Sequence, residues 1–272
     1  MIQVPILTYH ANGIDGMEYH NNDHIALAAD LDLIHQMGFK IISLDQLMDW
    51  RLGKAPDSSV ENTVVLTCDD GTDFDFYDIN HPTYGVQTSF FNILKSHQAN
   101  TRQQVHMTDF VIVSPAARVI LDQVCLVGQG WWNDNWWQEA QDSDLMHIAN
   151  HSWDHNHGVL DNENVNDDSF HHINNLQQCD RQLRQSQEFM IKHFSHGYKN
   201  QYFAYPYGNY SNYLRYEYLP TFGNEIGLHA ALTTEPKHVN QSTDIWSLPR
   251  YVCNNDWENS EQLQQILTHG FC

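Results

Sequence analysis

The feature that most constrains the fold is a regular alternation between short apolar runs and amphipathic segments in the first part of this 272-residue chain. Residues 2–10, 40–44 and 63–68 are apolar runs that predict strands, whereas residues 24–37 and 44–53 have apolar side chains at helical spacing. Strands that are connected through helices lie parallel in one sheet, with the helices packed outside it. The alternation therefore predicts an α/β protein built on a mainly parallel sheet.

The later part of the chain continues this pattern after an irregular stretch. Residues from about 97 to 143 mix polar loops, a β-branched run and four tryptophans between Trp131 and Trp137, and we expect them to form an insertion. Packing of these tryptophans in the core or over a loop is the simpler interpretation, and stacking against sugar rings is the alternative. We predict a single domain over residues 1–272. Its further strands are expected at residues 86–94, 145–150, 201–210, 227–236 and 247–253, and its further helices at residues 168–194 and 260–271.

The charge restricts the partners that the protein can bind. The chain has 34 acidic residues against 13 lysines and arginines, so its formal net charge is −21. Such a surface repels nucleic acids and anionic membranes, and it is compatible with a neutral or cationic ligand such as a sugar or an aminosugar. No apolar stretch reaches the roughly 18 residues that predict a transmembrane helix. No feature of the sequence indicates an oligomeric state.

The cysteines and the first residues bear on the cellular compartment. The chain has five cysteines, an odd number, and they are far apart in the sequence. This pattern indicates neither a disulfide framework nor a CxxC metal site, and it suits a protein of a reducing compartment. The first ten residues contain no basic region followed by a long apolar run, so they do not predict a signal peptide. We therefore expect a cytoplasmic protein, or an exported one if a leader precedes the given residues.

Histidine spacing alone does not locate a site, because the chain contains 18 histidines. Three pairs have a four-residue spacing that metal ligands use on a helix, namely His20/His24, His147/His151 and His151/His155. Functional groups in parallel-sheet proteins collect where strands end and loops begin. His20 and His24 precede a helix, where solvated positions are expected, and His147 is expected to be a hydrogen-bonded core histidine. Only His151 and His155 follow a predicted strand, which makes them the best candidates.

Two adjacent acids end a predicted strand in the stretch VVLTCDDG. Asp-Asp-Gly is most often only a turn, but here a purely apolar run precedes Asp69 and Asp70, and a histidine pair follows another strand. One carboxylate and two imidazoles form a three-ligand site with a position left open, which is the pattern of a catalytic metal. Consecutive side chains of a strand point to opposite faces. One aspartate can therefore hold the metal while its neighbour accepts a proton from water.

Several motifs resemble those of one enzyme family, the NodB-like polysaccharide deacetylases (carbohydrate esterase family four). LTCDDG resembles the family's TFDDG signature, HSWDH matches its His-(Ser/Thr)-x-x-His motif, and FAYPYGNY resembles its Pro-Tyr turn. LTTEP and SLPRY resemble later strands of the branch that deacetylates poly-N-acetylglucosamine. The motifs follow the family's order along most of the chain, and the first two are specific only together. The resemblance implies a distorted (β/α) barrel that hydrolyses an N-acetyl group of a sugar on a divalent metal.

The resemblance also implies roles for individual residues. Asp69 corresponds to the general base, and Asp70, His151 and His155 correspond to the metal ligands. Tyr207 corresponds to the residue whose backbone N–H helps to hold the tetrahedral oxyanion. Zn²⁺ is the expected metal because it suits two imidazoles and a carboxylate, although cobalt, nickel or iron could use the same ligands.

Two histidines are candidates for the general acid that protonates the leaving amine. His269 lies in LTHG, which resembles the family's Leu-x-His motif, and His10 lies in LTYH at the end of the first predicted strand. In the poly-N-acetylglucosamine branch the motif order is permuted, and such an N-terminal histidine takes this role. Because His10 ends a strand and His269 lies in a predicted helix, we prefer His10.

Two departures from the family pattern concern the neighbourhood of the base. Cys68 replaces the phenylalanine of TFDDG, and a small apolar thiol can fill this buried position. The arginine that orients the base in many relatives is absent ahead of the Pro-Tyr turn. Arg250 is a candidate to replace it, and an exposed structural arginine is the alternative. Arg250 is also, with Trp132 and Pro206, a predicted substrate-binding residue.

Together these features predict a metal-dependent hydrolase that removes N-acetyl groups from an N-acetylated sugar or polysaccharide. One alternative is a deformylase or amidohydrolase that acts on a small or lipid-linked sugar. The other is a carbohydrate-binding protein whose active site has decayed, an interpretation supported by the missing arginine and the tryptophan cluster.

Overall fold

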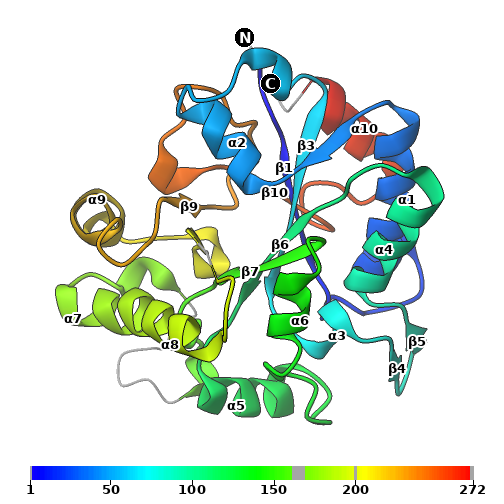
Figure 1. Cartoon of the computed structure of the whole chain (residues 1–272). Helices are drawn as coiled ribbons and strands as arrows, with labels where there is room; N and C mark the ends of the chain where they lie inside the picture. Colours follow the sequence, from blue (N-terminus) through cyan, green and yellow to red (C-terminus); the bar gives the residue numbers. More distant parts are fainter. Residues whose placement is uncertain (1, 161–168, 199–200, 270–272) are drawn as a thin grey trace.

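A curled parallel sheet occupies the centre of the molecule (Figure 1). In the computed structural model, which describes residues 2–160, 169–198 and 201–269, the strand order is β10-β1-β3-β6-β7-β8-β9, and β2 pairs with the first half of β3. A further bridge between Leu232 and Leu248 connects β9 to the segment just before β10. This confirms the predicted distorted (β/α) barrel. The strands are β1 (Ile6–His10), β2 (Lys40–Ile42), β3 (Thr63–Asp70), β6 (Met107–Val111), β7 (Met146–Asn150), β8 (Tyr202–Ala204), β9 (Ala230–Leu232) and β10 (Tyr251–Val252).

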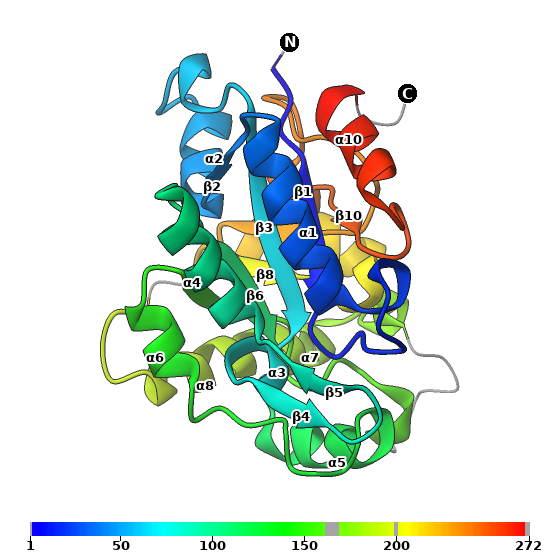
Figure 2. The ribbon, with the colours of Figure 1, turned by 90° about the vertical axis from the view of Figure 1, so that its right-hand side faces the viewer.

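Helices cover the outer face of the sheet, and α1 packs between α4 and α10 (Figure 2). The strands β1 and β3 run toward the end of the barrel that carries α3, α5 and the β4–β5 hairpin (Figures 1 and 2). None of the helices within the described ranges combines the length and apolar character that a membrane crossing requires. The helices are α1 (Asp23–Gln36), α2 (Leu44–Arg51), α3 (Asp73–Phe76), α4 (Phe90–Thr101), α5 (Pro115–Cys125), α6 (Trp137–Asp142), α7 (Leu176–Cys179), α8 (Gln185–His193), α9 (Leu219–Phe222) and α10 (Ser260–His269), and the hairpin is β4 (Ile79–His81) with β5 (Gly85–Gln87).

The predicted strand at residues 86–94 is wrong for most of its length. β5 ends at Gln87, and α4 begins at Phe90 because the Ser89 side chain caps it by accepting a hydrogen bond from the backbone N–H of Asn92. The apolar residues of this segment therefore follow helical rather than strand spacing. By contrast, the helix predicted at 24–37 agrees with α1, whose Asn22 cap accepts from the N–H groups of His24 and Ile25.

The predicted insertion at residues 97–143 is wrong in its first part. Residues 97–101 complete α4, and β6 lies between β3 and β7 near the middle of the sheet. Thr108 and Asp109 make this strand less apolar than its neighbours, which explains why its pattern is weak. Within the tryptophan cluster, Trp136 and Trp137 are fully buried, so these two rings are core residues and not a sugar-stacking surface.

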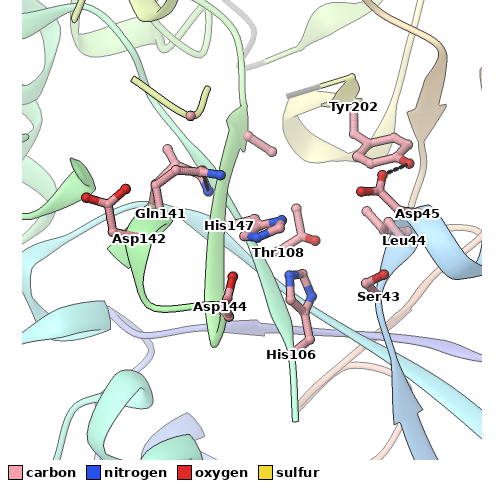
Figure 3. Close-up of a pocket in the computed structure, with 13 residues that line it drawn as sticks. Ser43, Leu44, Asp45, His106, Thr108, Gln141, Asp142, Asp144, His147 and Tyr202 are labelled. Carbon is pink, nitrogen blue, oxygen red and sulfur yellow. Dashed lines mark hydrogen bonds between the residues drawn. The ribbon is translucent and has the colours of Figure 1, made fainter. Parts of the chain in front are cut away.

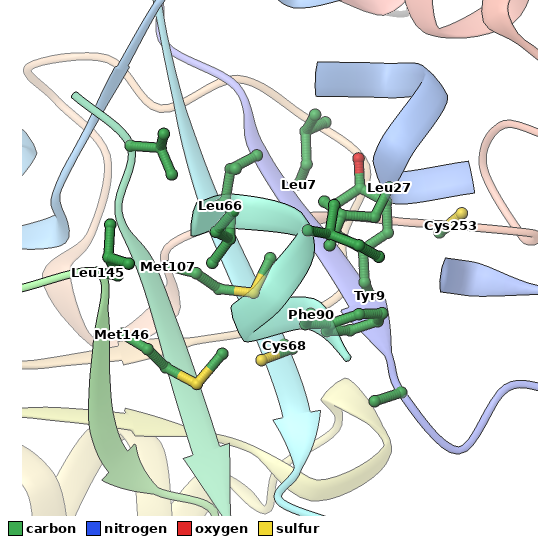
Figure 4. Packing of buried hydrophobic residues seen from close by; sticks show 14 of the residues in the cluster. Leu7, Tyr9, Leu27, Leu66, Cys68, Phe90, Met107, Leu145, Met146 and Cys253 are labelled. Atoms are coloured by element: carbon green, nitrogen blue, oxygen red, sulfur yellow. The ribbon is translucent and has the colours of Figure 1, made fainter. Parts of the chain in front are cut away.

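Apolar side chains of β3 are buried on both faces of the sheet. Leu66 and Cys68 point outward and pack with Leu27, Phe90 and Met107 in the layer beneath α1 and α4 (Figure 4). A strand that is covered on both faces is largely apolar, which accounts for the run at residues 63–68, where only the hydrogen-bonded Thr63 and Thr67 carry a hydroxyl group. The cluster on the inner face includes Val65, Phe110, Ala204 and Leu232.

Candidate active site

Asp69 and Asp70 bring two carboxylates to the end of β3. Asp69 continues the strand, whereas Asp70 has a φ of 81° and Gly71 a φ of 72°. This turn lets both acids reach one cavity, although strand alternation alone would separate them. A side chain at Gly71 is excluded, because a Cβ there would lie 2.4 Å from Cγ1 of Val111 on the neighbouring strand β6.

A buried arginine holds Asp69 in place. Nη1 and Nη2 of Arg250 donate to Oδ1 and Oδ2 of Asp69 at 2.7 and 2.8 Å, and the two side chains are 0% and 5% exposed. Nε of Arg250 donates to the carbonyl oxygen of Thr233 at 3.0 Å. Burial acts to raise the pKa of Asp69, but Arg250 and His151 outweigh it and hold this pKa below its usual range. Asp69 is thus an ionised carboxylate in a fixed orientation, and an exposed position for Arg250 is ruled out.

Asp70, His151 and His155 converge although they are far apart in the sequence. Their ligand atoms all lie within 4.8 Å of one another, and Oδ1 of Asp70 is 3.8 Å from Nε2 of each histidine. Asn12 donates to the other oxygen of Asp70 at 3.0 Å, and Nδ1 of His151 is paired with the carbonyl oxygen of Ala204 at 3.0 Å. These hydrogen bonds orient Asp70 and His151 so that Oδ1 and Nε2 face each other. Hydrogen bonds of this kind commonly orient metal ligands.

The two histidines lie on a loop and not on a helix. Ser152 and His155 have positive φ angles of 76° and 61°. The side chain of Asn150 accepts from the N–H of Ser152 at 2.7 Å, and the hydroxyl oxygen of Ser152 accepts from the N–H of His155 at 2.9 Å. The four-residue spacing therefore acts through a tight turn after β7, and the helical interpretation of this spacing is wrong.

The protonation states of this trio suit a divalent metal ion. Burial lowers the pKa of His151, and burial followed by the charge of His151 lowers the pKa of His155 to about 3. Burial acts to raise the pKa of Asp70, but the surrounding histidines outweigh it and lower this pKa. Two neutral imidazoles and one carboxylate are the donors that Zn²⁺ and related metals accept. The residues present therefore fit a metal ion, and Zn²⁺ is among the metals that they fit.

Most of the predicted site residues line one cavity of about 460 Å³ at this end of the strands. His10 and Tyr207 line it together with Asp69 and the three candidate ligands, so the structure brings these six residues together. Pro206 and Arg250 are buried and are not among its lining residues. The side chain of His269 lies outside the described part of the chain, so its proposed role remains a prediction.

Tyr207 and Trp132 meet the cavity in different ways. Tyr207 is 36% exposed, has a φ of 57°, and its ring centroid is 4.3 Å from that of His155. Trp132 is only 6% exposed, packs with Ile112 and Leu121, and donates its indole N–H to the carbonyl oxygen of Asp70 at 3.1 Å. Trp132 therefore supports the backbone at Asp70 and presents little of its ring to a ligand.

Sequence analysis missed several residues that line the cavity. Asn12 hydrogen bonds to Asp70, and its position two residues after His10, just past a strand end, was the available signal. His157 also lies at the site, two residues beyond His155, and its ring nitrogen is 3.6 Å from the thiol sulfur of Cys125. For Cys125 no local pattern indicated a position at the site.

The other histidines of these pairs, His20, His24 and His147, do not line the active-site cavity, and His20 is exposed. His24 is 3% exposed, and its ring nitrogens pair with the carbonyl oxygens of Ala11 and Thr88, so the expectation of a solvated His24 is wrong. His147 lies in β7, as expected, but it is only half-buried and lines a second cavity of about 410 Å³ with His106 (Figure 3), so the expectation of a core histidine is wrong. This second cavity lies by the first residues of β6, β7 and β8, away from the two aspartates at the other end of the sheet.

Solved structures share this fold over nearly the whole chain. The Streptococcus pyogenes deacetylase PplD, solved in complex with acetate, is 17% identical with a TM-score of 0.65, and the match covers 98% of both chains. IcaB from Ammonifex degensii is 18% identical with a TM-score of 0.63, over 96% of each chain. BC0361, a polysaccharide deacetylase from Bacillus cereus, is 16% identical with a TM-score of 0.64, over 98% of this chain and 69% of its own. At such identities these likenesses show a common fold.

Sequence comparison gives the family. No curated protein sequence matches the chain significantly. The family model described as polysaccharide deacetylase matches residues 57–221, which is more than half of the chain and includes both aspartates, both histidines of the loop and Tyr207. The chain therefore belongs to the polysaccharide deacetylase family.

Proposed function

We propose that this protein is a metal-dependent carbohydrate N-deacetylase. One observation carries the proposal. Asp70, His151 and His155 converge to within 4.8 Å, while Asp69 stands beside them with both oxygens held by Arg250. The arrangement offers a metal site and, next to it, a separate carboxylate that can accept a proton. Family membership supports hydrolysis of acetyl groups from a sugar.

The residues of the cavity can divide the reaction between them. A divalent metal held by Asp70 and the two histidines would supply Lewis-acid polarisation of the amide carbonyl and of water. Asp69 accepts a proton from water as its oxygen adds to the carbonyl carbon, and the backbone N–H of Tyr207 donates to the oxyanion that forms. His10 then donates a proton to the amide nitrogen as the C–N bond breaks. Acetate and a free aminosugar are the products.

The surroundings of the cavity support an oligomeric sugar as the substrate. A neighbouring hollow of about 660 Å³ shares Gly208 with the site and is lined by tyrosine, asparagine and histidine side chains, including Tyr210 and Tyr213. Such side chains combine a flat apolar face with hydrogen-bonding groups, which suits sugar rings. The net charge of −21 disfavours a polyanionic substrate and suits a product that carries free amines.

The decisive experiment combines metal analysis with acetate release from chitooligosaccharides. We expect wild type to contain metal and to release acetate. Asp70→Ala should lose one metal equivalent together with activity, whereas Asp69→Asn should keep the metal and lose roughly 10²–10⁴-fold in kcat. The exposed acid Asp49, changed to Asn, is the control for altered charge. A metal ion that depends on Asp70, without acetate release, would indicate hydrolysis of another amide, and absence of both this ion and acetate release would indicate a binding protein.

The two candidate general acids can be separated in the same assay. His10 lines the cavity at the end of β1, so His10→Asn should lower kcat more than KM changes. His269→Asn should leave both constants close to those of wild type. The opposite result would transfer the role to His269.

A further inference from the structure

A second group of potential metal ligands lies behind the active site, on the other face of β3. Cys68 of β3, Asp75 of α3 and Asp109 of β6 each offer one ligand atom, and these atoms all lie within 4.8 Å of one another. Cys68 and Asp109 are direct neighbours in the β3–β6 register. All three side chains are 0% exposed. Cys68 points into the outer core with Leu66 (Figure 4), whereas Asp69 next to it points into the barrel toward Arg250.

Apart from the Cys68 thiol beside them, three carboxylate oxygens of this group are buried without a hydrogen-bond partner among the described residues. They are both oxygens of Asp109 and Oδ1 of Asp75. The other oxygen of Asp75 accepts from the N–H and the hydroxyl of Thr72 at 2.6 and 2.9 Å, which fixes the Asp75 carboxylate. A buried polar atom without a partner is costly, and a buried charge far more so. Several such atoms in one place imply a bound species that satisfies them.

No side-chain cation of the described residues compensates these acids. Neither Asp75 nor Asp109 forms an ion pair within the described ranges. In the absence of a cation, burial and then the charge of Asp75 raise the pKa of Asp109, and burial raises that of Asp75 to about 8. Both carboxyl groups would then hold a proton. Either two protons or one bound cation can therefore neutralise these acids.

The donor atoms match the coordination of a transition metal. The thiol sulfur of Cys68 and one carboxylate oxygen each from Asp75 and Asp109 provide three ligand atoms for a transition metal. The sulfur favours Zn²⁺ and similar metals over Mg²⁺ or Ca²⁺. Cys68 also occupies the position where the related motif has phenylalanine, and its thiol supplies a sulfur ligand that phenylalanine lacks. The contacts from Thr72 orient Asp75 in the way that outer hydrogen bonds orient metal ligands.

We propose that Cys68, Asp75 and Asp109 bind a second divalent transition-metal ion, such as Zn²⁺, in a buried structural site. The ion replaces the thiol proton, so that one thiolate and two carboxylates neutralise it. It joins β3, β6 and α3 directly behind Asp69 and Asp70. It takes no part in the reaction, which occurs on the other face of β3, and it stabilises the strand end that carries both catalytic aspartates.

The number of metal ions per chain tests the proposal, with Asp70→Ala as the starting protein so that the two sites are counted separately. We expect about two ions in wild type, about one in Asp70→Ala, and none when Cys68→Ala is added. Cys179, another fully buried cysteine, provides the matched control, because Cys179→Ala should leave the metal content unchanged. Reconstitution of Asp70→Ala with Co²⁺ should give a sulfur-to-metal charge-transfer band that Cys68→Ala removes.

Thermal unfolding of the zinc-loaded protein separates a metal from shared protons. If a metal binds, Asp109→Asn lowers Tm by roughly 5–10 °C. Removal of the metal with a chelator then lowers the Tm of Asp70→Ala but leaves the Tm of Asp70→Ala/Cys68→Ala unchanged. If protons satisfy the acids, Asp109→Asn mimics the protonated carboxyl group and leaves Tm unchanged or raised. That second result, or metal-free Asp70→Ala, would overturn the proposal. Neither result would affect the proposed deacetylase activity, which is measured with Asp70 intact.

Discussion

Replacement of Arg250 by methionine tests whether this arginine holds Asp69, the proposed general base. Arg250 is fully buried and makes both of its contacts with Asp69 at less than 3 Å. Methionine keeps much of the side-chain volume and removes the charge. Asp69 would then remain buried without the two donors that its carboxylate has among the described residues.

The size of the effect follows from the burial. Removal of one partner of a buried ion pair costs about 3–5 kcal/mol, because the other charge stays in a poorly solvated place. Burial alone acts to raise the pKa of Asp69, and Arg250 is the largest of the influences that lower it. The Asp69 pKa in Arg250→Met should therefore rise, so that a higher pH is needed to ionise the base. We expect kcat/KM to fall by up to roughly 10²–10⁴-fold at neutral pH and its acidic limb to move to higher pH.

Two assays on the metal-loaded protein measure these effects. Urea unfolding gives the free energy of unfolding, and acetate release from chitooligosaccharides gives kcat/KM as a function of pH. Asp69→Asn/Arg250→Met should regain stability but not activity, with a coupling energy of at least about 1.5 kcal/mol between the two sites. Arg51, which donates to the carbonyl oxygen of Thr243, is the control, because Arg51→Met should change neither the rate nor its pH dependence. An unchanged kcat/KM in Arg250→Met would show that Asp69 does not depend on Arg250.

Two further predictions concern stability. Gly71→Ala should lower the free energy of unfolding by about 2–4 kcal/mol, because residue 71 has a positive φ and its new Cβ would clash with Val111. The control is Gly38→Ala, where φ is similar and no atom lies within 4 Å of the new Cβ. It should cost only about 1 kcal/mol in the same urea titration. Burial raises the pKa of Asp30 from 3.8 to about 6 despite donors from Tyr19, Trp257 and Tyr9, so its contribution is most favourable below about pH 4 and is lost as pH rises through 6. Wild type should therefore lose about 2.5 kcal/mol relative to Asp30→Asn between pH 4 and pH 7.5, and a constant difference across that range would contradict this pKa.

Local pattern was sufficient for much of the barrel. The apolar run at residues 63–68 became β3, and the helical spacing at residues 24–37 became α1. Both elements could be predicted from adjacent residues, because the period with which side chains alternate direction is set within each strand or helix. Local pattern gave the wrong element at residues 86–94, where Ser89 caps a helix and most of the apolar run is helical. It also missed β6 as a central strand, because Thr108 and Asp109 weaken the apolar pattern there.

The candidate site was likewise predictable only in part. Strand ends and motif spacing indicated Asp69, Asp70, His151 and His155, but not the turn through positive φ angles that aims both aspartates at one cavity. Arg250 lies 181 positions after Asp69 in the sequence, so the role of that arginine stayed undecided until the fold placed it in the barrel.

The sequence by itself thus determined the α/β class, the strand that ends in two acids, and the residue types able to hold a metal. Only the tertiary structure decided that Arg250 clamps Asp69, that Asn12 supports Asp70, and that a buried thiol and two further acids meet behind them. The physical reason is that side-chain direction within one element follows from a few adjacent residues. A contact between distant elements depends instead on the register and packing of the whole sheet.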